Sequence, residues 1–229
     1  MVRRLCLALA PVVAFLAQSA LAEGPNLSAD PQGGAGSAAQ LYLAQRAYAA
    51  ALVTGEVLPL LAAIRLAREV TLRPAPGWEV TRSGDGPAEA VTGGPDTIPD
   101  PGGDAALTIA RNLAGEDPDL QDLVYDLDAQ RPGGRTATAV EVRGDLGPGQ
   151  TDDWRLPLFG EVAAEIALIG NGDGPLALAF ADESGAIVCA QPASTTPVLC
   201  RVTPARNGFF TLSVHNPGPL VNSYRLIGN

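Results

Sequence analysis

The chain has 229 residues, and its formal net charge at neutral pH is −10. This acidic balance argues against nucleic acid or an anionic membrane surface as a partner, because both bind a basic face. All 15 basic residues are arginine, so chemistry that needs a lysine amine, such as Schiff-base formation, is excluded. The length is sufficient for one large or two small domains with buried cores.

The first 22 residues have the three-part pattern of a cleavable export signal. Arg3 and Arg4 form a short basic region, and the apolar run Leu5–Leu16 follows them. Small residues then lead to a predicted cut between Ala22 and Glu23. The apolar run is too short for a membrane span, and no later segment is long and apolar enough to be one. We therefore expect a periplasmic or secreted protein, exported by the general secretory route rather than the twin-arginine route.

Two cysteines, Cys189 and Cys200, remain after the predicted cleavage, because Cys6 leaves with the signal. An even pair in an oxidising compartment predicts a disulfide. A pair of metal ligands or a nucleophile are the alternatives, and neither has a nearby histidine to complete it. The bond would tie two neighbouring strands across one loop and contribute about 3 kcal/mol of stability by restricting the unfolded chain.

The remaining chain divides into a helical part and a strand-rich part. We expect a signal peptide at 1–22, a flexible leader at 23–36, a helical region at 37–130 and a β-sandwich domain at 136–229. Apolar residues recur at helical spacing over 37–72 and 104–130, which predicts two helical hairpins. Residues 73–103 are crowded with Pro and Gly and predict a loop without regular elements. Within this loop, Trp78 either packs onto a domain or serves as an exposed contact residue.

Capping residues indicate where the predicted helices begin and end. Ser37 begins a capping-box pattern, and Asp104 and Asp117 are placed to cap the two helices of the second hairpin. Gly55 and Gly115 are suitable residues to end a helix.

The last predicted helix has an apolar face and an acidic face. Its apolar stripe consists of Leu120, Leu123, Val124 and Leu127. Off this stripe lie Asp119, Asp122, Asp126 and Asp128. These aspartates are interpreted as a solvated acidic face; a metal cluster is the alternative, but no histidine or fixed ligand loop accompanies them.

After the turn Arg131–Gly134, the hydrophobic period changes from helical spacing to two-residue alternation. Eight short apolar runs follow, separated by turns rich in Gly, Pro, Asn and Asp. They are Ala137–Val142, Trp154–Phe159, Val162–Ile169, Leu176–Phe180, Ile187–Ala190, Val198–Val202, Phe209–Val214 and Tyr224–Ile227. Short strands at this spacing, with no helix between them, predict a β-sandwich.

Short motifs occur in a characteristic order in this region. They are Thr151–Trp154, the turn Gly172–Gly174 with the strand Leu176–Gly185, Gly208–Val214 and Asn222–Leu226. In these motifs, residues 136–229 resemble the bacterial pre-peptidase C-terminal domain. The resemblance implies a non-catalytic, jelly-roll-like sandwich that is removed on maturation or helps to bind substrates and surfaces. The predicted fold class is therefore α+β, with N-terminal helical hairpins followed by an all-β, jelly-roll-like sandwich.

Calcium is the one cofactor that the resemblance suggests, since some relatives of this domain bind it. The candidate ligands are Asp152, Asp153, Asp173, Asp182 and Glu183. Family members often carry Asp-x-Asp in the strand after the Gly-Asp turn, where this chain has Leu176–Ala179. Calcium needs about six to eight oxygen ligands, and turn residues without a metal explain the same carboxylates.

The sequence offers little for catalysis. His215 is the single histidine, and at the end of a predicted strand it is expected to have a structural role. No Gly-x-Ser-x-Gly elbow, phosphate-binding loop or dinucleotide fingerprint occurs. A carboxylate pair of the glycosidase kind is the remaining alternative, because the sequence does not show which of the 25 acidic residues lie close together.

Together these features predict an exported, non-catalytic accessory or interaction protein whose partner is an envelope protein or a surface polymer. A polysaccharide- or peptide-binding module, assisted by calcium, is the first alternative, and a carboxylate-based hydrolase is the second. Exposed apolar side chains on the helical hairpins would favour the interaction protein, whereas stripes packed wholly against the sandwich would argue against a partner surface there.

Overall fold

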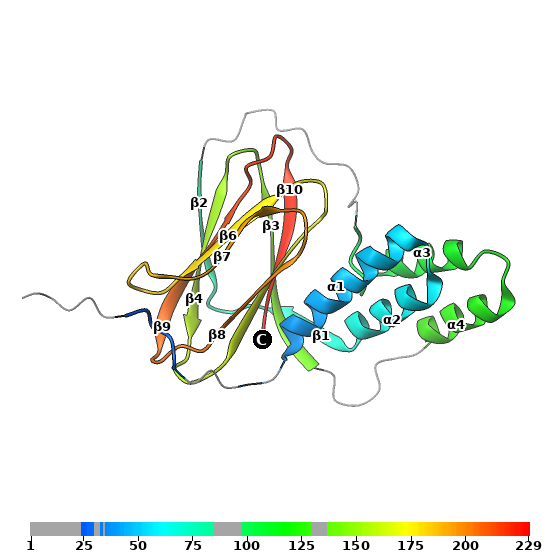
Figure 1. The fold of residues 1–229 in the computed structure, drawn as a ribbon, viewed down its shortest axis with the longest axis horizontal. Coiled ribbons are helices and arrows are strands. Elements are labelled where there is room, and N and C mark those ends of the chain that lie inside the picture. Colours follow the sequence, from blue (N-terminus) through cyan, green and yellow to red (C-terminus); the bar gives the residue numbers. More distant parts are fainter. Residues whose placement is uncertain (1–23, 30–32, 34, 85–97, 130–136) are drawn as a thin grey trace, which may run out of the picture.

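The computed structural model describes residues 24–29, 33, 35–84, 98–129 and 137–229. Within these residues the chain forms four α-helices and ten β-strands. Two five-stranded sheets pack face to face, and the helices form a layer on one side of them (Figure 1). The predicted α+β class, with helical hairpins and a sandwich, is confirmed. The predicted signal peptide and its cut between Ala22 and Glu23 lie outside the described residues.

Both predicted helical hairpins are present. Their helices are α1 (Ser37–Thr54), α2 (Val57–Arg68), α3 (Asp104–Ala114) and α4 (Pro118–Ala129). Gly55 ends α1 in the left-handed region, with a φ of 69°, which glycine adopts without strain. Asp117 caps α4 as predicted, because its Oδ1 accepts hydrogen bonds from the backbone N–H groups of Asp119 and Leu120. No helix in the described part of the chain has the length and apolar content needed to cross a membrane.

The first turn of α1 is capped from a strand rather than by its own side chain. The predicted capping box at Ser37 is wrong, because Gly36 occupies the N-cap and makes no side-chain cap bond. Instead, Oε2 of Glu165 accepts hydrogen bonds from the backbone N–H groups of Gly36, at 2.9 Å, and Ala39, at 3.1 Å. Oε1 of this buried carboxylate accepts from Nε of Arg201 at 2.9 Å. A carboxylate at this position satisfies free amide groups and favours the positive end of the helix dipole.

The predicted cap at Asp104 is also wrong. Gly103 occupies the N-cap of α3, so Asp104 is the first helical residue and makes no cap bond. Its exposed carboxylate lies 3.6 Å from Nη2 of Arg68 on α2, which places an ion pair between the two hairpins.

All eight apolar runs predicted in the C-terminal region form strands. They are β3 (Ala137–Leu146), β4 (Thr151–Leu158), β5 (Ala164–Gly170), β6 (Leu176–Ala181), β7 (Ile187–Ser194), β8 (Val198–Val202), β9 (Gly208–His215) and β10 (Asn222–Gly228). Two further strands, β1 (Val70–Pro74) and β2 (Glu79–Ser83), precede them. Sheet A has the strand order β1-β3-β10-β5-β8, and sheet B has the order β2-β4-β9-β6-β7.

The prediction that residues 73–103 contain no regular element is wrong. β1 pairs in parallel with β3, and β2 pairs antiparallel with β4, so each forms an edge of a different sheet. All five side chains of β2 are exposed, and only Val70 is buried in β1. β2 therefore lacks the alternating apolar pattern that indicates a sandwich strand in a sequence, and β1 shows it only over Val70–Arg73, directly after α2. The sandwich begins before the predicted boundary at residues 130–136, because two of its described strands come from the N-terminal half of the chain.

Trp78 lies in the turn between β1 and β2 and packs against the core between the sheets, which is one of its two predicted roles. Gly228 leaves room for it, because a Cβ at that position would lie 2.9 Å from a ring carbon of Trp78. Burial of this large ring stabilises the point at which the chain crosses from sheet A to sheet B.

Three apolar clusters hold the layers together. The largest lies between the sheets and includes Phe180 and Phe210, whose ring centroids are 5.5 Å apart. A second joins α1 to the outer face of sheet A through small residues such as Ala44 and Ala167. The third lies among the four helices and includes Tyr48 of α1. Because α1 contributes to the second and third clusters, it connects the helices to the sandwich (Figure 1).

A buried polar bridge connects the two sheets inside the sandwich. Asp152 and Trp154 of β4 face Tyr224 of β10, and all three side chains are buried. The Tyr224 hydroxyl donates to Oδ2 of Asp152 at 2.6 Å and accepts from Nε1 of Trp154 at 2.7 Å. Arg82 of β2 adds two hydrogen bonds of 2.7 Å to the Asp152 carboxylate. Each polar group of the bridge thus has a partner, as burial requires.

Two further features maintain this bridge. Gly144 is needed beside Tyr224, because a Cβ there would lie 2.6 Å from the tyrosine ring. Burial and the hydrogen bond to Asp152 raise the pKa of Tyr224 above its usual value, so the phenol stays protonated and remains a donor.

Cys189 and Cys200 form the predicted disulfide. Cys189 lies on β7, at an edge of sheet B, and Cys200 lies on β8, at an edge of sheet A. The two strands follow each other along the chain but pair with different neighbours, β7 with β6 and β8 with β5. The bond therefore joins the two sheets at one side of the sandwich.

Replacing both cysteines by serine is expected to lower the free energy of unfolding by about 3 kcal/mol, because the cross-link restricts the unfolded chain. Urea unfolding followed by tryptophan fluorescence measures the change. A reducing agent should destabilise the unaltered chain by a similar amount and leave the Cys189→Ser/Cys200→Ser variant unchanged. An equal response of the two proteins to the reducing agent would contradict this role.

Replacing Tyr224 by phenylalanine leaves Nε1 of Trp154 buried without its acceptor. We expect a loss of about 1–3 kcal/mol in the free energy of unfolding, the cost of a buried unsatisfied polar group. Tyr125→Phe is the matched control, because Tyr125 is 71% exposed. The control should stay within about 0.5 kcal/mol of the unaltered chain in the same urea titration. If both variants are as stable as the unaltered chain, the bridge is not a stabilising element.

Candidate functional site

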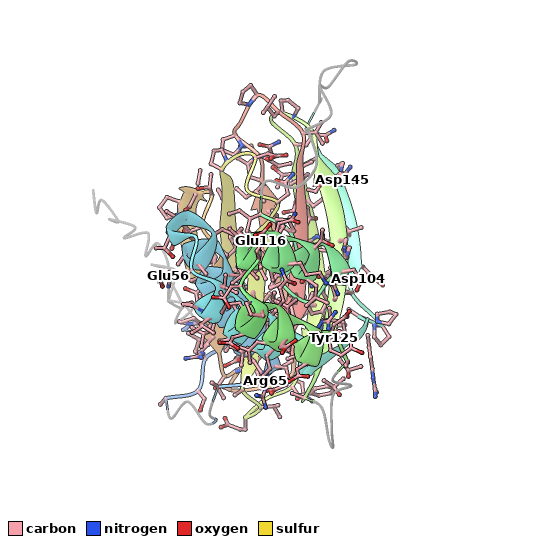
Figure 2. The ribbon with its side chains drawn as sticks, turned by 90° about the vertical axis from the view of Figure 1, so that its right-hand side faces the viewer. Glu56, Arg65, Asp104, Glu116, Tyr125 and Asp145 are labelled. Atoms are coloured by element: carbon pink, nitrogen blue, oxygen red, sulfur yellow. A yellow bond between two sulfur atoms is a disulfide. The ribbon has the colours of Figure 1, made fainter. Side chains whose placement is uncertain are left out.

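The helical layer presents a surface that faces away from the sandwich (Figure 1). Figure 2 views the molecule from the side of α3 and α4, where Asp104, Glu116 and Tyr125 lie. These two helices are at the front of this view, and the sheets lie behind them. The surface combines exposed apolar side chains with carboxylates, and both features follow from how the four helices pack.

An open groove lies between α2 and α4. It has a volume of about 290 Å³ and is lined by Leu58, Leu61, Ala62, Arg65, Leu123, Asp126 and Leu127. Leu58 on α2 is 58% exposed and Leu123 on α4 is 45% exposed. The groove therefore presents two large apolar side chains, one from each helix, above an apolar floor.

The exposure of Leu123 differs from the prediction that it belongs to the core stripe of α4. Val124 and Leu127 of that stripe are buried, and Leu120 packs partly against the helical core. α4 packs against α2 and α3 and is placed at the far side of the helical layer from the sheets (Figure 1). Its neighbours therefore cover only part of the apolar stripe, and Leu123 faces the groove.

Carboxylates are frequent on α4, and one of them, Asp126, lines this groove. The four aspartates predicted to form a solvated face on α4 are all exposed. Arg111 pairs with one of them, Asp128, at 2.6 Å. Within the described ranges, no ion pair is formed by Glu116, Asp119, Asp122 or Asp126. The α4 side of the groove is consequently negative, whereas the α2 side carries Arg65, which pairs with Glu69 at 3.5 Å.

The five predicted calcium ligands do not come together in one place. Asp152 belongs to the buried bridge, Asp153 accepts a hydrogen bond from Ser213, and Asp173 accepts one from Asn171. Asp182 and Glu183 are neighbours in the turn after β6. No group of three or more His, Cys, Asp or Glu residues that could hold a metal occurs among the residues described. Calcium binding stays a prediction.

Asp182 and Glu183 instead hold the predicted flexible leader. Asn26 is fully buried, and its backbone N–H donates to Oδ2 of Asp182 at 2.7 Å. Its side-chain amide donates to Glu183 and to the carbonyl oxygen of Arg206 and accepts from the backbone N–H of Arg206 at 2.9 Å. Asn26 therefore fixes the leader on the sandwich, and the next two residues add to this contact. Leu27 packs against the core between the sheets, and the backbone N–H of Ser28 donates to the carbonyl oxygen of Thr203 at 2.7 Å. A single asparagine in a stretch without periodicity gives no sequence signal for such a contact.

Hydrogen bonds determine the charge state of Asp182. Burial alone raises the pKa of this carboxyl, but the donors from Ser184, Asn26 and Ala186 together outweigh burial and hold the pKa below its usual value. The carboxylate is the form that the turn and the leader require.

The predicted structural role of His215 agrees with its contacts. Nδ1 of His215 lies 2.9 Å from Oγ1 of Thr151, its cross-strand neighbour on β4. The buried carboxylates of the described residues are Asp152, Glu165 and Asp182. Asp152 accepts hydrogen bonds in the buried bridge, Glu165 accepts them at the start of α1, and Asp182 accepts them in the turn after β6. No carboxylate pair of the glycosidase kind is therefore found among these three.

The Asp182 carboxylate is expected to stabilise the chain at neutral pH and to lose this contribution in acid. Its pKa is lower in the folded chain than in the unfolded chain, so the contribution is present above about pH 4 and is lost as the pH falls through the folded pKa. Asp182→Asn should be less stable at neutral pH and less sensitive to acid in urea unfolding at several pH values. Asp122→Asn on the exposed face of α4 is the control, and an identical acid response of both variants would contradict this role.

A scan against protein-family models returns no match for this chain, and no curated protein matches it. A search of solved structures finds the pre-peptidase C-terminal domain of collagenase from Bacillus anthracis. The match has 16% sequence identity and a TM-score of 0.34, and it covers 39% of this chain and 87% of that chain. The solved domain belongs to the family that the strand motifs of residues 136–229 resemble.

Proposed function

We propose that this chain is an exported, non-catalytic accessory protein that binds a partner protein through its helical layer. The observation that carries the proposal is the groove between α2 and α4, where Leu58 and Leu123 are about half exposed. Adjacent exposed apolar side chains within a polar surround are typical of interaction surfaces. The helical apolar stripes do not pack wholly against the sandwich, which was the condition that would have argued against such a surface.

The proposed occupant is an amphipathic helix of the partner, with basic residues beside its apolar face. A groove with one helix on each side, α2 and α4, suits a helix laid into it, which is a recurring mode of recognition. The carboxylates of Glu116, Asp119, Asp122 and Asp126 would face the basic residues. Complementary charge of this kind increases the rate of encounter and selects the partner.

The binding free energy available from the two exposed leucines agrees with a transient or regulated contact. Covering the exposed halves of Leu58 and Leu123 would each contribute about 1 kcal/mol from apolar burial. A few well-buried anchors dominate most interfaces, and neighbouring contacts mainly exclude water. The groove supplies two such anchor positions on a surface that is otherwise polar.

Export is the second part of the proposal. The disulfide between Cys189 and Cys200 is the kind of bond that persists in an oxidising compartment. The signal pattern of residues 1–22 agrees with this compartment and remains a sequence prediction. An envelope protein or a secreted protein is then the natural source of the proposed helix, with the sandwich as a rigid base that orients the helical layer.

The groove is tested by fluorescence anisotropy with a labelled synthetic helix that carries leucines on one face and arginines on the other. We expect the unaltered chain to bind it, and we expect Leu58→Ser/Leu123→Ser to bind about tenfold more weakly, because both anchor positions are lost. Added salt should weaken binding through screening of the carboxylates.

Leu43→Ser/Leu113→Ser is the matched control, because these leucines are 57% and 39% exposed on α1 and α3 and do not line the groove. The control should bind like the unaltered chain. A synthetic helix with glutamates in place of the arginines should not bind. Equal binding by both double variants, or no binding of the basic helix at all, would refute the proposed occupant.

A further inference from the structure

Each sheet of the sandwich ends in two edge strands, which are β1 and β8 in sheet A and β2 and β7 in sheet B. An edge strand presents unpaired backbone groups to other chains, and proteins commonly protect such edges. β7 contains Pro192 and has register shifts along its pairing with β6. β8 contacts β7 and is joined to it by the disulfide, and Pro74, which has no N–H, ends β1. These three edges therefore have features that hinder pairing with another chain.

The edge strand β2 (Glu79–Ser83) has none of these features. It contains no proline or glycine, and it pairs with β4 in one continuous register, from Glu79 opposite Arg155 to Ser83 opposite Thr151. All five of its side chains are exposed, and no described strand pairs with its other side. Among the described strands, β2 is therefore the edge best suited to accept a further strand.

The two charges of β2 are matched within its own sheet. Arg82 lies opposite Asp152, whose buried side chain points to the core, and donates two hydrogen bonds of 2.7 Å to that carboxylate. Side chains alternate along a strand, so Glu79 and Thr81 lie on the outer face of sheet B. The Glu79 carboxylate lies 3.5 Å from the guanidinium of Arg155. An incoming strand therefore meets no unbalanced charge at this edge.

We infer that β2 pairs antiparallel with β2 of a second copy of this chain, so that the two copies of sheet B join across a twofold axis. The register with Thr81 opposite Thr81 of the second copy pairs every residue of both strands. It places Glu79 opposite Ser83 and Val80 opposite Arg82, so no two like charges face each other. A register centred on Arg82 would oppose two arginines, and one centred on Val80 would pair fewer residues.

This pairing leaves the helical layer accessible. The helices pack against the outer face of sheet A, whereas β2 is an edge strand of sheet B (Figure 1). The groove between α2 and α4 shares no residue with β2. A dimer would therefore present two grooves, and a partner with two suitable helices would bind the dimer more tightly than it binds one groove.

Sedimentation velocity of the purified chain over a range of micromolar concentrations measures the association. We expect a reversible equilibrium between monomer and dimer. Thr81→Lys places two lysines directly opposite each other and should raise the dissociation constant of the dimer about tenfold. Ser83→Lys is the matched control, because it adds the same charge on the same exposed face but places the lysine opposite Glu79 of the second copy. This control should dimerise at least as tightly as the unaltered chain.

Cysteine cross-linking tests the register of the pairing. Residues 81 of the two copies would lie opposite each other with their Cα atoms about 4.5–5.5 Å apart, which a disulfide can span. Thr81→Cys should therefore form a covalent dimer when oxidised glutathione accepts the electrons of the two thiols. Ser83→Cys should not, because its two cysteines would lie four residues, or about 13 Å, apart along the paired strands. The unaltered chain controls for exchange with the disulfide between Cys189 and Cys200.

A chain that stays monomeric at every concentration would overturn the inference. A dimer that Thr81→Lys and Ser83→Lys leave equally tight would also overturn it, because the interface would then lie elsewhere. Equal cross-linking of both cysteine variants would contradict the inferred pairing. Leu58→Ser/Leu123→Ser should dimerise normally, and Thr81→Lys should bind the synthetic helix normally. Failure of the groove and failure of the β2 edge are therefore separate results.

Discussion

The docking of α1 on the outer face of sheet A determines where the rest of the molecule lies. Small side chains such as Ala38, Ala44 and Ala167 allow a close approach, and Glu165 of β5 receives the free amides at the start of the helix. The carboxylate is neutralised from its other side by Arg201 of β8. A helix end held by a buried, paired carboxylate has one position and one direction, and α2, α3 and α4 are built outward from it. The groove between α2 and α4 and the recess lined by Gln45 and Arg225 both depend on this placement.

The sandwich provides a base that resists separation of its sheets. The bridge of Asp152, Tyr224 and Trp154 links the sheets from within, and the disulfide joins them at one side. Asn26 adds a contact with the turns that follow β6 and β8. Its partner Asp182 is buried, and several hydrogen-bond donors replace the water that would otherwise solvate this carboxylate. Hydrogen-bonded polar groups inside an apolar core favour one arrangement of the strands over others, because a shifted arrangement would leave them unpaired.

The parts of the fold that the sequence predicts are those with a local pattern. Eight strands, two hairpins and the cap at Asp117 follow from periodicity and from turn residues. β1 and β2 escape prediction because they are short edge strands with little burial, and only Val70 and Leu72 of β1 alternate with polar residues. The cap of α1 escapes because its carboxylate is 129 residues away in the chain, at Glu165. At the groove, periodicity shows that α4 has an apolar stripe, but which part of it stays uncovered depends on the number of helices packed around it.

The strands β1 and β2, one at an edge of each sheet, make the sandwich a discontinuous domain. In chain order, β1 and β2 come first, α3 and α4 follow, and β3 and β4 come next. β3 then pairs with β1, and β4 pairs with β2. The second hairpin is thus an insertion within the sandwich rather than a neighbour joined to it by a linker. A fragment that begins at residue 137 would expose the backbone groups of β3 and β4 together, and unpaired edges of this kind recruit other chains. The strand-rich block that resembles a separate module in the sequence cannot therefore be excised or transplanted as one continuous piece without loss of both edges.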